Sequence, residues 1–265
     1  SPWGYGFPGW HIECSAMSHK YLGEKFDIHG GGIDLKFPHH DCEIAQSESA
    51  YGENPANFWI HTNMLTLNGK KMSKSTGNSV FPNEIFEGKN SIFSKSFSPM
   101  TLKFFMFQAH YRNTLDLSNN ALLASEKAFE KIAQLKIDLQ SVKVSDSSDL
   151  NAEDWIDNCY DSLNDDFNSP KLIACLFELN KLISLVKNSK VQLDSTNKKL
   201  YIKYFRIFSE DILGLNFNKT QIDSQSEIID ILLELREKER KNKNFETSDY
   251  IREKLNSLGI NIEDN

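Results

Sequence analysis

The stretch FDIHGGGIDLKFPHHDCEIAQSESAYG, residues 26–52, decides the fold of the N-terminal region. It opens on a short apolar strand signal, residues 26–28, which breaks into Gly30, Gly31 and Gly32. Glycines placed directly after a strand allow the backbone to approach a ligand closely, as nucleotide-binding crevices require. We therefore expect this stretch to belong to an α/β sheet of the nucleotide-binding kind, with the glycines lining a crevice.

The second half of the stretch predicts a helix that carries candidate metal ligands. Pro38 suits the first position of a helix that ends at Gly52. His39 and Glu43 are then four residues apart and share one helix face. Cys14, in the separate segment GWHIECSAM, completes a set of one sulfur, one nitrogen and one oxygen. Three mixed ligands suit Zn2+, and fewer than four protein ligands leave a position open for a substrate or water.

The same residues also have a purely structural interpretation. A helical His–Glu pair is often a solvated contact, and a lone cysteine is often a small buried hydrophobe. His40 and Cys42 are rival ligands, although Cys42 points about 100° away from Glu43 on a helix. Spacing alone leaves both interpretations open, because zinc motifs also arise by accident.

A second informative segment is LNGKKMSKSTGN, residues 67–78. Asn68 and Gly69 form the dipeptide typical of a tight hairpin turn. Lys71 and Lys74 follow among small residues. Two ammonium groups placed in this way can neutralise a triphosphate as charge develops during the departure of pyrophosphate. The alternative is a charge-rich surface turn.

Residues 71–75 read KMSKS, the signature loop of class I aminoacyl-tRNA synthetases. With GWHIECSAM, HGGGIDL and FPHHDCEIAQ, the segment KMSKSTGN resembles the cysteinyl-tRNA synthetase family in particular. The later pieces HYR, residues 110–112, and LNDDFNSP, residues 163–170, are similar to the same family. The similarity extends over nearly the whole chain.

This resemblance implies a zinc site. In the family, two cysteines, a histidine and a glutamate hold one zinc ion per subunit, and Cys14, His39 and Glu43 stand at the matching positions. Trp10 resembles the family's tryptophan beside the amino-acid pocket, and Asp34 resembles its pocket carboxylate. In this family zinc selects the thiol of the substrate cysteine, and the resemblance implies the same selection here.

The resemblance also implies a reaction, that of a cysteine–tRNA ligase. Cysteine and ATP, the latter with Mg2+, give cysteinyl-adenylate, and the aminoacyl group passes to tRNA(Cys). Lys71 and Lys74 are then the catalytic residues, while Gly30, Gly31, Gly32 and Asp34 line the adenylate crevice. Two alternatives stay open: a ligase that joins cysteine to an amino-sugar on the same core, and a noncatalytic zinc- or nucleotide-binding relative.

Parts of the family pattern have no counterpart in this sequence. The family's other zinc cysteine and its His-Ile-Gly-His ATP motif belong to an N-terminal half, and no His-x-Gly-His string occurs in these 265 residues. We therefore expect the chain to correspond to the C-terminal half of such a protein. Segment 87–96, EGKNSIFSKS, reads as a short insertion of no evident chemistry.

Composition is that of an ordinary globular protein, with 39% apolar and 25% charged residues. No apolar run approaches the roughly 20 residues that span a bilayer. Four irregularly spaced cysteines favour a reducing compartment, so we expect a cytoplasmic protein. We also expect it to be a monomer and to have no membrane partner. The net charge of −7 argues mildly against a nucleic-acid binder, and only the resemblance implies contact with tRNA.

The patterning predicts three regions. Residues 1–97 mix short strand signals with helices, as expected of a partial Rossmann-like α/β catalytic domain that contains the KMSKS loop. Residues 98–217 have helical periodicity and predict an α-helical bundle that binds tRNA. Residues 218–265 predict a small C-terminal module on the anticodon side, made of two helices closed by Gly259 and a short strand, INIED.

Within the bundle region, Ser169 is expected to cap a helix with Pro170 at its first position. Long amphipathic runs begin at residues 119 and 198 and predict two further helices. The polar stretches 144–151 and 217–226 are expected to be linkers.

Overall fold

The computed structural model describes every residue except 1, 3, 73–76, 218–220, 243 and 258–265. For residues 221–230 and 256–257 it describes the backbone and not the side chains. The chain separates into two compact units, Ser1–Leu215 and Asn216–Asn265. Among the described residues, no helix is long and apolar enough to cross a membrane.

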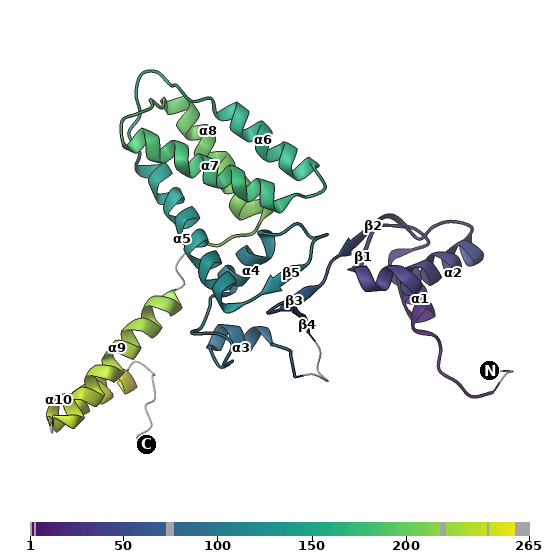
Figure 1. Cartoon of the computed structure of the whole chain (residues 1–265), viewed down its shortest axis with the longest axis horizontal. Helices are drawn as coiled ribbons and strands as arrows, with labels where there is room; N and C mark the ends of the chain where they lie inside the picture. The colour runs from purple at the N-terminus through teal and green to yellow at the C-terminus, as the bar shows by residue number, and fades with distance from the viewer. Residues whose placement is uncertain (1, 3, 73–76, 218–220, 243, 258–265) are drawn as a thin grey trace. The chain divides into compact units, whose positions relative to one another are not determined.

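The first sheet is parallel and two-stranded. β1 (Phe26–Gly32) pairs with β2 (Ala56–Thr62), and α1 (Trp10–Leu22) contacts α2 (Asp41–Tyr51) beside them (Figure 1). Strand side chains alternate between faces. The register therefore places His29, Trp59 and His61 on one face, where the histidine rings meet His40, and Ile28 and Phe58 on the other.

The three glycines lie inside β1 and not after it, so the expected break of the strand at residue 28 is wrong. Gly30, Gly31 and Gly32 continue the parallel pairing with β2. The physical reason lies at Gly31, where an added Cβ would stand 2.8 Å from Cε1 of His40. The missing side chain makes room for a ring of this same chain while the strand hydrogen bonds continue.

The helix expected after residue 37 is confirmed. Phe37 is extended, with φ −133° and ψ 133°, and the helical segment continues through His40 into α2. Gly52 ends the helix in the left-handed region, with φ 86°, and its N–H donates to the carbonyl of Glu48. Glycine tolerates this conformation without a Cβ clash, which explains why the helix ends here.

A second sheet carries the hairpin. β3 (Leu65–Leu67) pairs antiparallel with β4 (Lys70–Lys71) and parallel with β5 (Leu115–Leu117). Asn68 and Gly69 both have positive φ, 51° and 73°, as a tight hairpin turn requires. The hairpin predicted from this dipeptide is confirmed.

The apolar core of this region lies beneath the hairpin. α3 (Pro82–Glu87) and α4 (Pro99–Phe107) contribute to it with β3, β5 and the start of α5. Its buried members are Leu67, Ile85, Phe93, Phe97, Leu102, Phe105, Leu117 and Leu122. Phe93 belongs to segment 87–96, so this segment has a packing role that the sequence did not reveal.

Four helices follow in the same unit (Figure 1): α5 (Asn119–Ser141), α6 (Ala152–Asn164), α7 (Ser169–Lys187) and α8 (Ser195–Arg206). Of these, α6 was not anticipated from the sequence. The cap of α7 is Asn168, whose side chain accepts from the Lys171 N–H, so the expected cap at Ser169 is wrong by one residue. Pro170 consequently stands at the second position of the helix, and not at the first position that was predicted.

The second unit contains α9 (Gln221–Lys241) and α10 (Phe245–Ser257), which pack against each other. The two expected helices are present. The linker expected over 217–226 is shorter than predicted, because the helix already begins at residue 221. Gly259 and the predicted strand INIED lie outside the described residues. The predicted domain boundaries after residues 97 and 217 stay predictions.

Truncating Phe93 tests the packing role of segment 87–96. Phe93→Ala should lower the free energy of unfolding by about 3–4 kcal/mol, because it removes a buried ring that stands edge-on to Phe97. The exposed Ser91→Ala in the same segment is the matched control and should stay within about 0.5 kcal/mol. Equal unfolding free energies for the two variants in a denaturant titration would contradict the packing role.

Candidate active site

The predicted metal ligands come together in the structure. One ligand atom each from Cys14, His39 and Glu43 lies within 4.8 Å of the other two. Cys14 is carried by α1, and the other two by one face of the helix that continues into α2. His39 Nε2 stands 2.9 Å from Glu43 Oε1. The i,i+4 spacing read from the sequence therefore produces the expected geometry.

Glu43 is the most deeply buried member of this cluster, with 1% of its surface exposed. Its Oε1 atom is buried without a hydrogen-bond partner, although His39 is close. A buried carboxylate oxygen without a donor is costly unless a cation satisfies it. One thiol sulfur, one imidazole nitrogen and this oxygen form a donor set that Zn2+ accepts. The residues present therefore fit a zinc ion.

A second group of side chains contacts Glu43 from the strands. His29 Nε2 lies 3.4 Å from Glu43 Oε2, and His29, His40 and Glu43 also have ligand atoms within 4.8 Å of one another. His40 Nδ1 lies 2.9 Å from His61 Nε2. The rival ligand His40 thus shares Glu43 with the predicted triple, while Cys42 belongs to neither group among the described residues.

The aromatic surroundings hold these rings in place. Trp10 lies over His39, with ring centroids 4.3 Å apart. His11 Nδ1 stands 2.9 Å from His39 Nδ1, which leaves Nε2 of His39 directed to Glu43. Trp59 contacts the rings of both His29 and His40. Sequence reasoning missed His11, His29 and His61, because isolated histidines carry no local spacing signal.

Burial dominates the electrostatics of the cluster. It raises the pKa of Glu43 to about 7 and lowers the pKa of His40 to about 4. Burial also raises the pKa of the Cys14 thiol, with a smaller contribution from the charge of Glu43. Without a cation, the site therefore favours neutral forms of its groups.

The predicted adenylate-binding residues have different surroundings. Gly30 faces open space except for the carbonyl of Ile60, whereas the His40 ring fills the space above Gly31. The carboxylate of Asp34 lies against the backbone of Gly32, and Asp34 is exposed.

Lys71 belongs to the second sheet, at the end of β4, and its side chain is exposed. Asp116 holds the preceding turn: its Oδ1 accepts from the Thr66 hydroxyl and from the Gly69 N–H, each at 2.6 Å. The hydrogen bond from Thr66, and to a smaller extent the one from the Gly69 N–H, lowers the pKa of Asp116. Asn78 donates to the Lys71 carbonyl at 3.2 Å. Lys74 lies outside the described residues.

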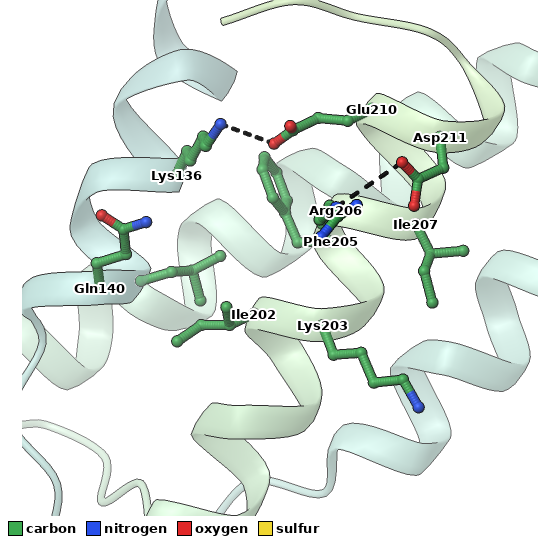
Figure 2. A pocket seen from close by; sticks show the side chains of 10 residues that line it. Lys136, Gln140, Ile202, Lys203, Phe205, Arg206, Ile207, Glu210 and Asp211 are labelled. Carbon is green, nitrogen blue, oxygen red and sulfur yellow. Dashed lines mark ion pairs between the residues drawn. The ribbon is translucent and has the colours of Figure 1, made fainter.

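A separate hollow of about 760 Å³ lies between α5 and the helix that runs from α8 to residue 212 (Figure 2). An ion pair between Lys136 on α5 and Glu210 crosses it at 2.9 Å, and a second pair, Arg206 with Asp211 at 3.8 Å, lies along the one helix. None of the predicted site residues lines it.

Comparison with known proteins places this geometry in a family. A model described as "tRNA synthetases class I (C) catalytic domain" matches residues 1–127, and a model described as "DALR domain" matches residues 158–218. The chain is 45% identical over 268 residues to a protein of Porphyromonas gingivalis named cysteine–tRNA ligase. The chain is similar over its whole length to members of the cysteinyl-tRNA synthetase family. Further relatives of the same name, from Cytophaga hutchinsonii and Chlorobaculum tepidum, are 45% and 41% identical.

Each of these relatives is longer than the chain. The alignments cover all of this chain but only 54–55% of each cysteine–tRNA ligase. Among solved structures, the LeuRS of Agrobacterium radiobacter K84, in a ternary complex with tRNA and LeuAMS, matches with a TM-score of 0.51 and 16% identity. That match covers 71% of this chain and 25% of the LeuRS, and at this identity it supports the fold alone.

Alanine substitutions at neighbouring glycines test how the site is packed. Gly31→Ala should lower the free energy of unfolding by about 1–3 kcal/mol, because its Cβ would displace His40 and Leu35. Gly30→Ala is the matched control, since its Cβ would meet only the Ile60 carbonyl at 3.6 Å. Denaturant titration of both variants makes the comparison. A Gly31→Ala variant as stable as Gly30→Ala would contradict the packing of His40 against β1.

Proposed function

We propose that the protein containing this chain is a cysteine–tRNA ligase, which joins cysteine to tRNA(Cys) at the expense of ATP, with Mg2+. The observation that carries the proposal is the cluster of half-buried Cys14 with buried His39 and Glu43, in a chain similar to this family. A sulfur–nitrogen–oxygen site with an unsatisfied carboxylate oxygen suits a metal that binds a thiol. The relatives share the name cysteine–tRNA ligase, which favours this function over transfer to an amino-sugar.

Cys14, His39 and Glu43 would hold the zinc ion. Zinc, when bound, supplies a strong preference for a thiolate over a hydroxyl. His11 fixes the ring of His39 through their 2.9 Å contact, so that Nε2 stays directed into the site. Trp10 lies against the same ring and is placed to close the pocket around a small side chain.

The remaining groups bind and orient the other substrate parts. Asp34 is an exposed carboxylate beside Gly32 and can accept a hydrogen bond from the substrate ammonium or a ribose hydroxyl. Lys71, with Lys74 from the same motif, is placed to neutralise charge on the departing pyrophosphate. Most of the rate enhancement then comes from positioning and charge stabilisation.

We further propose that the bundle over residues 98–217 contacts the inner corner of tRNA and that residues 218–265 approach the anticodon. The helices of both regions support this assignment, as does the DALR domain match at 158–218. The protein would act as a monomer in the cytoplasm. Its described cysteines are all free, which agrees with a reducing compartment.

The decisive assay measures cysteine-dependent exchange between ATP and pyrophosphate in the full-length protein that contains this chain, followed by charging of tRNA(Cys). Serine replaces cysteine as the negative control, and an amino-sugar acceptor replaces tRNA to examine the alternative ligase. Exchange without any charging of tRNA(Cys), or no exchange at all, would overturn the proposed function.

Removal of the Lys71 charge should slow adenylate formation. Lys71→Ala is expected to lower the pre-steady-state exchange rate by two to three orders of magnitude, about 3–4 kcal/mol, as for other donors that stabilise developing charge. Lys74→Ala should have an effect of the same size. Lys70→Ala is the matched control, because neighbouring strand residues point to opposite faces. If exchange stayed near the unsubstituted rate and only transfer to tRNA slowed, the assignment would fail.

Zinc analysis tests the metal site independently of activity. Cys14→Ser and His39→Ala should lose the metal, since each removes a ligand, while Cys42→Ser should retain it. His11→Ala should lower zinc affinity by about 10–100-fold without abolishing binding, as expected for a group that orients a ligand. Elemental analysis and competition with a chelator measure both effects. A Cys14→Ser variant with full zinc content would exclude this cluster as the site.

A further inference from the structure

Two motifs from the sequence, HYR at residues 110–112 and DDF at 165–167, meet in the structure. Tyr111 donates its hydroxyl hydrogen to Asp166 Oδ1 at 2.7 Å, and Arg112 donates from Nε to Asp166 Oδ2 at 2.5 Å. His110 Nε2 stands 3.8 Å from the same Oδ2. The three side chains are stacked on one another, His110 on Tyr111 and Tyr111 beneath the guanidinium of Arg112. The Asp166 carboxylate therefore interacts with all three side chains of loop 110–112.

The turn that presents this carboxylate has an unusual backbone. Asp166 and Phe167 both have φ of 54°, in the left-handed region. This conformation is uncommon for any residue with a Cβ and is a true outlier for a bulky one. Burial does not explain it, because Phe167 is 62% exposed. The turn is kept in shape by polar contacts, among them the Phe167 N–H donating to the Leu163 carbonyl.

The contacts of Asp166 contribute little to stability. In its ion pair with Arg112 the two side chains are 63% (Arg112) and 41% (Asp166) exposed, and such surface pairs are worth at most about 1 kcal/mol. Strain at two consecutive residues and an exposed ion pair together give no stability argument for this arrangement. Strained backbone of this kind is concentrated at functional sites. The arrangement therefore calls for a functional explanation.

The other side of the loop is bonded to the first sheet. Asn63, directly after β2, donates its backbone N–H to the Tyr111 carbonyl and its side-chain amide to the Arg112 carbonyl, each at 2.8 Å. His61, two residues earlier, contacts His40 of the candidate site. A small hollow of about 130 Å³, lined by His61, Asn63 and Arg112 among others, lies at this junction. Loop 110–112 thus bonds Asn63, the residue after β2, on one side and the α6–α7 turn on the other.

We propose that Asp166 is a positioning residue that ties the turn between α6 and α7 to loop 110–112, and through Asn63 to the strand that bears His61. This inference rests on the proposed function. Cysteine activation needs only the groups on the sheet side, which the Asn63 hydrogen bonds keep in place. Transfer to tRNA also needs the helical region to keep a fixed position relative to the candidate active site, and Asp166 supplies this connection.

The test compares two steps in the full-length protein with Asp166→Gly and Asp166→Asn. Glycine removes the carboxylate and also relieves the left-handed strain, and asparagine keeps the side-chain shape without the charge. We expect transfer of cysteine to tRNA to fall about 10–100-fold, the range for lost positioning. Cysteine-dependent exchange of pyrophosphate should stay within about threefold, and the melting temperature of Asp166→Gly within about 2 °C.

Asp165→Asn is the matched control. Asp165 lies on the same turn, and its carboxylate accepts hydrogen bonds from Lys171 of α7 and from the cap residue Asn168. With loop 110–112 it has an electrostatic interaction with His110, in place of the hydrogen bonds that Asp166 accepts there. It should leave the ratio of transfer to exchange unchanged. Asn63→Ala, which loosens the sheet side, should lower exchange as well as transfer. If Asp166→Gly left transfer unchanged, or lowered exchange, transfer and melting temperature together, a positioning role would be excluded.

Amide hydrogen exchange decides the inference even if the full-length protein proves to have another activity. Asp166→Gly should speed amide hydrogen exchange at residues 110–114 and 163–168 more than Asp165→Asn does, because Asp166 accepts the hydrogen bonds from Tyr111 and Arg112 that join the two segments. Equal exchange rates in the two variants would overturn the connection. An absence of cysteine-dependent pyrophosphate exchange in the unsubstituted protein would instead overturn the proposed function, so the two failures are distinguishable.

Discussion

Burial of the Glu43 carboxylate is the constraint on which the N-terminal region depends. Its two oxygens face different elements: Oε1 lies near His39 on its own helix, and Oε2 lies near His29 on β1. Taking an ionisable group out of water is costly unless polar partners surround it. The helix that carries His39 and Glu43, strand β1 and α1 must therefore stay packed together, since each supplies a side chain whose ligand atom lies within 4.8 Å of a Glu43 oxygen.

The contribution of the sequence differs from residue to residue. The pairing of His39 with Glu43 and the turn at Asn68 and Gly69 were predictable, because each depends on spacing within a few residues. No separate helix was predicted over α6, although its buried residues Trp155, Ile156 and Cys159 recur at the spacing of one helix face. The approach of His61 to His40 depends on strand register, which no local pattern specifies.

Lys71 and the turn at residues 166 and 167 differ in how the surrounding structure supports them. Lys71 is exposed, yet its strand adjoins a core of buried aromatic and aliphatic residues, and Asp116 fixes the turn before it. The lysine can therefore be directed outward without loss of stability. The strained pair at residues 166 and 167 shows the opposite arrangement, in which local backbone strain is retained with little apolar burial in return. Sequence motifs pointed to residues of both kinds, but only the dihedral angles reveal the strain at residues 166 and 167.

The exposed face of the first sheet has a practical consequence. Ile28 and Phe58 are paired across the strands and are 57% and 66% exposed, and among the described residues no third strand joins β1 or β2. Unpaired strand edges beside apolar side chains are templates for strand addition between copies. A polypeptide limited to the first sheet and the helices beside it should therefore self-associate as its concentration rises. Light scattering against concentration, with charged substitutions at Ile28 or Phe58, would guide the choice of a fragment suitable for crystallisation or NMR.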